Sequence, residues 1–138
     1  MPNIKFSTVL LYILVKYVLF YILVMFINED YSFIHFYLIR NINDFTYYLF
    51  TFSFLPVIYT LLFSVIIYFS FTAKSIFVFA ALLAMVTIGE YFVYVYFNSQ
   101  EHIDQFGVYN AIISIAVFIV LFRKPIWSNY FEQSKAVK

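Results

Sequence analysis

The sequence predicts an all-α integral membrane protein in which four transmembrane helices form one compact bundle. Hydrophobic residues make up 65% of the chain, and its mean hydropathy is +0.93. Charged residues make up only 11% and gather in short clusters that separate four long apolar runs. Because soluble domains are only about half apolar, this composition excludes an ordinary soluble fold.

Each apolar run is close to the ~20 residues that a helix needs to cross the hydrocarbon core. The runs cover roughly residues 6–27, 46–71, 75–97 and 106–122, and a basic tail covers 123–138. The first run contains Lys16 and is followed by no small-residue cleavage site, so we expect a retained helix and not a signal peptide. A length of 138 residues then predicts a single domain.

Lysine and arginine predict the orientation of the bundle. With four spans, both termini and the turn between the second and third helices share one side of the membrane. That side carries six basic residues and the other side carries only Arg40. The six are Lys5, Lys74, Arg123, Lys124, Lys135 and Lys138. The positive-inside rule therefore places the termini in the cytoplasm or an organellar matrix, with the protein in a bacterial or organellar inner membrane.

The outer connection at 28–45 is too long for a turn and too charged to span the bilayer. Aromatic and aliphatic residues lie between His35, Arg40 and Asp44, which predicts a short interfacial or partly re-entrant helix between the first two spans. Arg40 and Asp44 are spaced to pair on one helical face. These three residues are the candidates for an outer-surface site.

Small and polar residues at helical spacing predict the faces on which the helices pack, because close approach and interhelical hydrogen bonds drive association in lipid. We expect these faces to point into the bundle. They comprise Ser53, Pro56, Thr60 and Ser64 in the second span, Ala80, Ala84 and Thr87 in the third, and Gly107, Asn110, Ala111 and Ser114 in the fourth.

Lys16 and Glu90 are the only ionisable side chains, tyrosine aside, deep in the predicted spans. Each costs on the order of 3 kcal/mol at a helix centre, so each needs a partner. Lys16 lies ~15 Å and Glu90 ~22 Å from the inner ends of their helices, and the lysine stem covers much of that difference. Asn110 comes near the same depth, Tyr12 lies one turn below Lys16 and could add a hydroxyl, and Thr87 precedes Glu90 on the same face. The sequence thus predicts an intramembrane polar cluster around Lys16 and Glu90.

Three interpretations of this cluster stay open. A polar clasp would fix which helices meet. A proton- or cation-handling site would use Glu90 as the working carboxylate and Lys16 as its charge partner. In the third interpretation both residues face a partner protein and are satisfied only in a complex.

The sequence offers little for catalysis or cofactor binding. It contains no cysteine, which excludes disulfides, thiolate nucleophiles and cysteine-ligated metals. Both histidines, His35 and His102, fall in outer connections, and neither a metal-binding spacing nor a nucleophile motif is present. With two glycines in the chain, a phosphate-cradling loop is not expected. We therefore predict no enzyme activity, no metal and no cofactor.

The leading functional hypothesis is a non-enzymatic inner-membrane protein that acts through other membrane proteins. It would be an accessory or assembly subunit, or an immunity-type protein that engages an intruding toxin. The alternative is a small homo-oligomeric transporter or channel that uses Glu90 and Lys16. A third class, a membrane enzyme acting on a lipid-linked substrate through His35, Arg40 and Asp44, rests on less. The expected partners are the bilayer and another membrane protein or a second copy, and the net charge of +1 indicates no nucleic acid.

Overall fold

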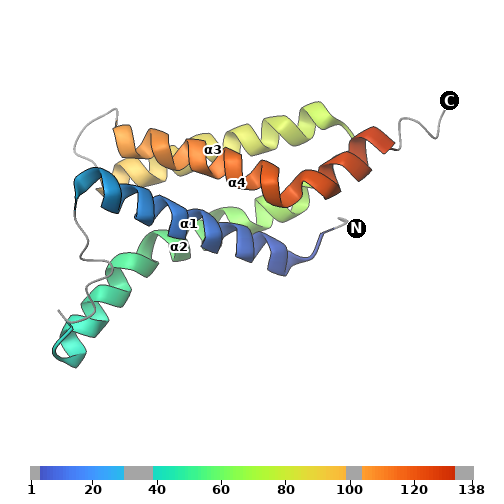
Figure 1. The fold of residues 1–138 in the computed structure, drawn as a ribbon. Helices are drawn as coiled ribbons and strands as arrows, with labels where there is room; N and C mark the ends of the chain where they lie inside the picture. The colour runs from blue at the N-terminus through green and yellow to red at the C-terminus, as the bar shows by residue number, and fades with distance from the viewer. Residues whose placement is uncertain (1–3, 30–38, 99–103, 133–138) are drawn as a thin grey trace.

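Four long helices make up nearly all of the described structure, a computed structural model that covers residues 4–29, 39–98 and 104–132 (Figure 1). The helices are α1 (Phe6–Asn28), α2 (Ile42–Ser70), α3 (Ile76–Asn98) and α4 (Gln105–Trp127), and a π-helical turn, η2 (Ser128–Glu132), follows α4. All four are long and apolar enough to cross a membrane. The predicted all-α, four-helix membrane fold is therefore confirmed.

The helices form a closed ring in which each contacts two neighbours. α1 packs against α2 and α4, and α3 packs against the same two helices. Neighbouring helices run in opposite directions, so the first turn of α1, the last turns of α4 and the turn between α2 and α3 lie at one end of the bundle (Figure 1). We call this the terminal end and the opposite one the outer end.

Two helix boundaries differ from those predicted. α2 begins at Ile42 and not near residue 46, because the Asn41 side chain caps it by accepting a hydrogen bond from the Asp44 amide at 2.9 Å. α4 continues through Arg123 and Lys124 to Trp127, since cations are favourable near a helix C-terminus. The predicted interfacial helix falls partly in α2, at residues 42–45, and otherwise largely on residues 30–38, which lie outside the described part of the chain.

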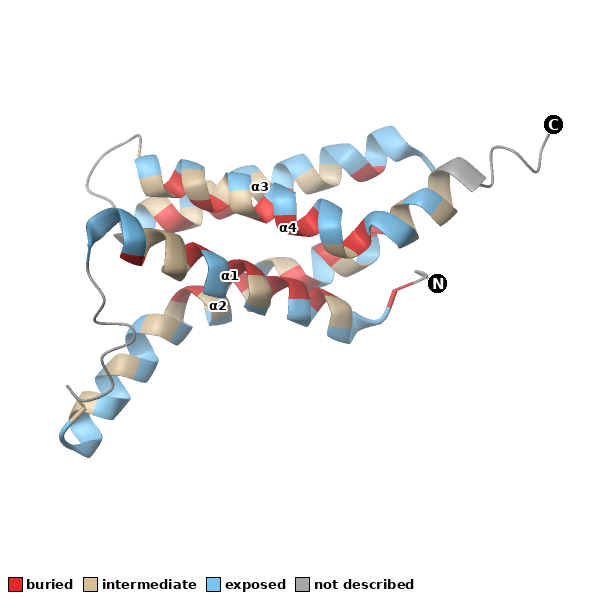
Figure 2. Cartoon of the chain, in the orientation of Figure 1, coloured by how far each residue is buried: buried red, intermediate tan, exposed pale blue. Residues whose placement is uncertain are grey.

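The core fills the space inside the ring (Figure 2). It contains aliphatic residues of α1 such as Val9 and Ile13, and many aromatic rings. At the terminal end, rings from three segments pack together, with centroids 5.0 Å apart for Phe71 and Phe79 and 4.6 Å apart for Phe118 and Phe122. Aromatic pairs of this kind add stability beyond the area that they bury.

Only some of the small residues that were predicted to face the interior of the bundle are buried. Ser64, Gly107, Asn110 and Ser114 are buried, as expected. Ser53 is exposed, and its hydroxyl donates to the carbonyl of Leu49 one turn earlier in its own helix. Ala80 and Ala84 are also exposed. The larger residues Phe79 and Val86 enter the core from α3 in their place, because aromatic and branched side chains fill the interior of the ring better than methyl groups do.

The first part of α2 leans away from the other helices (Figure 1). None of residues 42–51 is buried, and buried positions in α2 begin at Leu55, beside Pro56 in the helix interior. Proline removes a backbone hydrogen bond and favours a bend at such a position. Residues 42–51 are defined here as the projecting segment of α2.

Candidate functional site

An ion pair lies at the centre of the bundle. Lys16 Nζ of α1 contacts Glu90 Oε1 of α3, and the two side chains are 0% and 1% exposed. Two opposite charges in contact remove most of the cost that each alone would carry inside a membrane. The structure therefore brings together the two residues on which the predicted cluster was centred.

Glu90 receives three further hydrogen bonds. Tyr17 Oη of α1 and Asn110 Nδ2 of α4 donate to Oε1 at 3.3 Å and 3.0 Å. Ser114 Oγ of α4 donates to Oε2 at 3.0 Å. Hydrogen bonds to a charged acceptor are stronger than those between neutral groups. The carboxylate thus joins α3 to both α1 and α4.

Tyr12 extends the network by one hydroxyl. Its Oη lies 2.6 Å from Ser114 Oγ and 3.3 Å from the Ser114 carbonyl oxygen. A serine hydroxyl carries a single hydrogen, and that of Ser114 is directed at Glu90. Tyr12 is therefore the donor to Ser114. The result is a continuous hydrogen-bonded chain from Tyr12 through Ser114 to Glu90.

Aromatic rings surround the lysine. Lys16 Nζ lies 3.7 Å from the centroid of the Tyr59 ring and 4.3 Å from that of Tyr17. An ammonium over a ring face is attracted by the ring quadrupole, most strongly where water is excluded. Tyr59 belongs to α2, so all four helices contribute to the cluster.

Sequence reasoning missed Tyr17 and Tyr59 and included one residue wrongly. Thr87 lies half-buried at the right depth, but its hydroxyl donates to the Leu83 carbonyl of its own helix at 3.0 Å. A threonine in a helix can always satisfy itself in this way. Tyr17 directly follows Lys16 in sequence, which was the one available signal, yet adjacent residues diverge by about 100° around a helix.

The outer-surface candidates do not form a site in the described structure. His35 lies outside the described residues. The Asp44 carboxylate accepts a hydrogen bond from the backbone amide of Arg40 at 3.1 Å, and no Arg40–Asp44 side-chain ion pair forms among the described residues. Asp44 lies in the first turn of α2, where a carboxylate is favoured by the helix dipole. The predicted pairing is thus replaced by a helix-terminus interaction.

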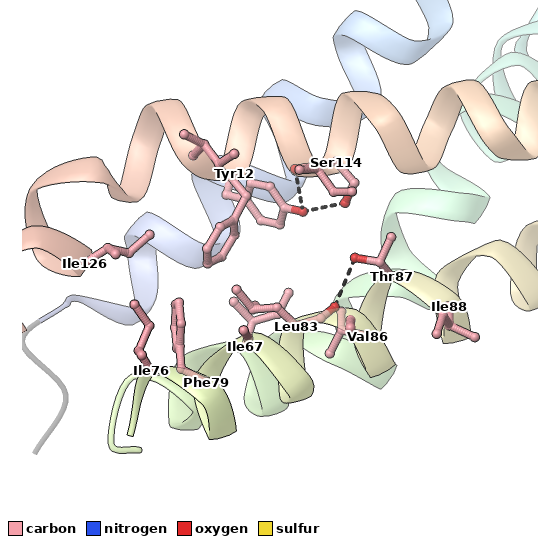
Figure 3. A pocket seen from close by; sticks show the side chains of 15 residues that line it. Tyr12, Ile67, Ile76, Phe79, Leu83, Val86, Thr87, Ile88, Ser114 and Ile126 are labelled. Carbon is pink, nitrogen blue, oxygen red and sulfur yellow. Dashed lines mark hydrogen bonds between the residues drawn. The ribbon is translucent and has the colours of Figure 1, made fainter. Parts of the chain in front are cut away.

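An apolar groove lies beside the cluster, between α3 and α4 (Figure 3). Its volume is about 520 Å³. Tyr12 and Ile67 reach it from α1 and α2, and Ser114 connects its inner wall to Glu90. At the terminal end the groove reaches Ile76 and Ile126 (Figure 3).

The cluster itself is closed. Phe20 and Tyr94 pack edge to face at 5.5 Å on its outer-end side, and Tyr12 and Phe118 pack in the same way at 5.5 Å toward the terminal end. Tyr17, Asn110 and Ser114 donate to the carboxylate, and Tyr12 donates to Ser114. This geometry can hold a charge pair and fix four helices relative to one another.

Comparisons with protein-family models, with curated proteins and with solved structures find no match. The site and the fold therefore carry the functional argument alone. The four spanning helices make the chain a membrane protein.

Proposed function

We propose that this chain is a non-enzymatic membrane subunit that acts by binding other membrane proteins. Its role would be that of an accessory or assembly subunit, or of an immunity-type protein. The observation that carries the proposal is the projecting segment of α2, which leaves the bundle although it belongs to a spanning helix.

The projecting segment has the composition of a helix-binding surface. Ile42, Phe45, Tyr47, Leu49 and Phe50 are all exposed along it. Aromatic side chains bury a large area on contact and lose little conformational entropy. The hydroxyls of Thr46 and Thr51 donate to carbonyls of their own helix, which leaves an apolar outer surface. A transmembrane helix of another protein, packed along this surface, would cover the side of α2 that the other described helices leave exposed.

The closed polar cluster supports the same proposal. A transported ion needs a path to its binding carboxylate, whereas a clasp needs to exclude competitors. Lys16 and Glu90 are almost completely buried and bonded to one another. We infer that the cluster holds the bundle in shape while the lipid-facing surface binds the partner.

The orientation belongs to the same proposal. Among the described residues, Lys5, Lys74, Arg123 and Lys124 lie at the terminal end and Arg40 lies at the outer end, which favours cytoplasmic or matrix termini and an inner membrane. The projecting segment then lies in the outer half of the bilayer, where a toxin or a partner helix arriving from outside would first meet it.

Site-specific photo-crosslinking in native membranes tests the proposal. A photoreactive amino acid replaces Tyr47 or Phe50 in the projecting segment, or Val120 of α4 as a matched control that is equally exposed. We expect a discrete protein adduct from positions 47 and 50 and none of the same mass from position 120. Lipid adducts alone at all three positions would refute a protein partner on this surface.

One observation favours a second candidate, a small homo-oligomeric transporter of protons or simple cations. Ser114, which donates to Glu90, also lines the groove between α3 and α4. An opening of the helices there would connect the carboxylate to the groove. Proteoliposomes measure this directly: the candidate requires a proton or cation flux that Glu90→Gln removes, and equal flux from both proteins rejects it.

A further inference from the structure

The groove between α3 and α4 has walls suited to hydrocarbon. Most of its lining is aliphatic or aromatic, and its side-chain polar atoms are three hydroxyls, those of Tyr12, Thr87 and Ser114. All three are already used, by Ser114, by the Leu83 carbonyl and by Glu90 respectively. A polar ligand would lose its hydrogen bonds to water and find no free partner on these side chains.

The groove is open toward the bilayer. Its rim consists of exposed residues, Ile88 on α3 and Ile115 and Ile119 on α4, whereas its floor is formed by the buried Val86 and Phe118. On the α3 side the wall of the groove is low, because the exposed Ala80 and Ala84 have small side chains. Side chains from the two helices face each other across the space (Figure 3). Because an unfilled groove forfeits dispersion contacts, a flexible apolar chain from the surrounding lipid would occupy it.

Positive charge lies where the groove meets the terminal end. Arg123 follows Ile119 by one helical turn on the same face of α4, which is about 6 Å along the axis. Arg123, Lys124, Trp127 and Ser128 line a second, more polar hollow. Arginine binds phosphate with two parallel hydrogen bonds, and tryptophan favours the headgroup level of a membrane.

We propose that the groove holds one acyl chain of an anionic phospholipid, whose phosphate is bound by Arg123. The lipid comes from the leaflet at the terminal end. The apolar walls select the chain, and the Arg123 guanidinium selects an anionic headgroup over a zwitterionic one. This site lies on the opposite half of the membrane from the projecting segment of α2, so it is independent of the proposed protein partner.

Native mass spectrometry tests the site on the full chain in mild detergent, with phosphatidylglycerol or phosphatidylcholine of the same chain length added. We expect one tightly retained phosphatidylglycerol for each protein. Ala84→Phe fills the groove and should lower that retention at least about tenfold, because close-packed walls cannot yield to a ring. Ala81→Phe is the matched control, since Ala81 is exposed on the same helix but does not line the groove.

A second pair of variants tests the headgroup contact. Removing the charge with Arg123→Gln should lower the preference for phosphatidylglycerol by about fivefold. Lys5→Gln removes an equal charge at the terminal end of the bundle, beside the first turn of α1, and should leave the preference unchanged. These variants leave the core intact, so they report on the site even if Ala84→Phe folds poorly.

The single tryptophan gives an independent readout in vesicles. Trp127 lines the polar hollow, so phosphatidylglycerol brominated near the headgroup end of its chains should quench its fluorescence more than the equivalent phosphatidylcholine does. Equal quenching by both lipids, or equal lipid retention by Ala84→Phe and Ala81→Phe, overturns the proposal. A protein dimer that Ala84→Phe disrupts would overturn it in favour of a second copy in the groove.

Discussion

Lys16 and Glu90 are each unfavourable in a membrane and acceptable only together. A lone charge at a helix centre costs on the order of 3 kcal/mol. Here the two charges touch, and Tyr17, Asn110 and Ser114 satisfy the carboxylate further. A buried pair of this kind adds little stability over an apolar pair of equal size, but losing one partner is severe. We therefore expect the pair to specify which helices meet more than it strengthens the bundle.

The coupling between these two residues can be measured. Unfolding free energies are compared in mild detergent for the wild type, Lys16→Met, Glu90→Gln and the double variant. We expect each single change to destabilise by about 3 kcal/mol because it strands a buried charge. The double variant should lose less than the sum, with a coupling well above the ~0.6 kcal/mol typical of interhelical polar contacts. Strictly additive losses would show that the residues do not clasp each other.

Ser114 and Thr87 provide a second comparison at the residue scale. Ser114→Ala removes a donor to Glu90 and the acceptor of Tyr12, so we expect a loss of about 1–3 kcal/mol. Thr87→Val removes a hydroxyl that bonds only within its own helix, and its effect should stay within about 0.5 kcal/mol. Chemical or thermal unfolding in detergent measures both. Equal losses would contradict the assignment of Ser114 to the cluster and Thr87 outside it.

Depth within the membrane was predictable from sequence, whereas direction around each helix was not. Counting residues from the helix ends placed Lys16 within reach of Glu90, Asn110 near the same depth and Tyr12 one turn below Lys16, and the structure brings all four into one network. Tyr59 was missed because the inward face predicted for α2 followed Ser53, Pro56 and Thr60, whereas the buried positions begin with Leu55 and Tyr59. When a helix has no polar face, its sequence indicates how deep each residue lies in the membrane but not which way that residue points around the helix axis.

At the scale of helices, apolar length predicted each span and local caps set the ends. Asn41 and Asp104 accept hydrogen bonds from backbone amides three residues ahead, so α2 and α4 begin where they do. The packing faces were harder to predict. Ala80 and Ala84 line an open groove and not a helix interface, since a small side chain permits close approach but does not require it.

Gly107, like Gly89, is a position where a neighbouring helix leaves little room for a side chain. A Cβ atom there would lie 3.0 Å from Tyr91 Cε2 and 3.2 Å from Tyr94 Cδ1, both on α3. We expect Gly107→Leu to destabilise the protein by about 1–3 kcal/mol through overpacking between α3 and α4. Val108→Leu, on the exposed side of the same turn, is the control and should change little. Unfolding in detergent provides the measurement, and a neutral Gly107→Leu would contradict the close approach of these helices.

The whole molecule is a ring of antiparallel helices whose terminal and outer ends differ in charge and shape. The terminal end carries Lys5, Lys74, Arg123 and Lys124, the aromatic cluster and the mouth of the groove. At the outer end α2 leaves the ring. Overall hydropathy predicts the number of spans, but this asymmetry depends on tertiary contacts that composition cannot encode. The two proposed binding surfaces therefore face opposite halves of the bilayer.

Cysteine labelling tests the topology of the whole chain without background, because the native sequence contains no cysteine. Single cysteines replace the exposed residues Ser7 and Ser75 at the terminal end, and Asn43 and Gln105 at the outer end. In spheroplasts a membrane-impermeant maleimide should label positions 43 and 105 directly, and positions 7 and 75 only after permeabilisation.

Each pattern of labelling has a distinct meaning for the fold. The reverse pattern would overturn the orientation inferred from the basic residues but leave the four-span bundle intact. Opposite accessibility of positions 7 and 75 would be more serious, because both lie at the terminal end only if α1 and α2 each cross the membrane once. A loss of the sidedness expected here after Arg123 and Lys124 are neutralised would show that these cations orient the chain.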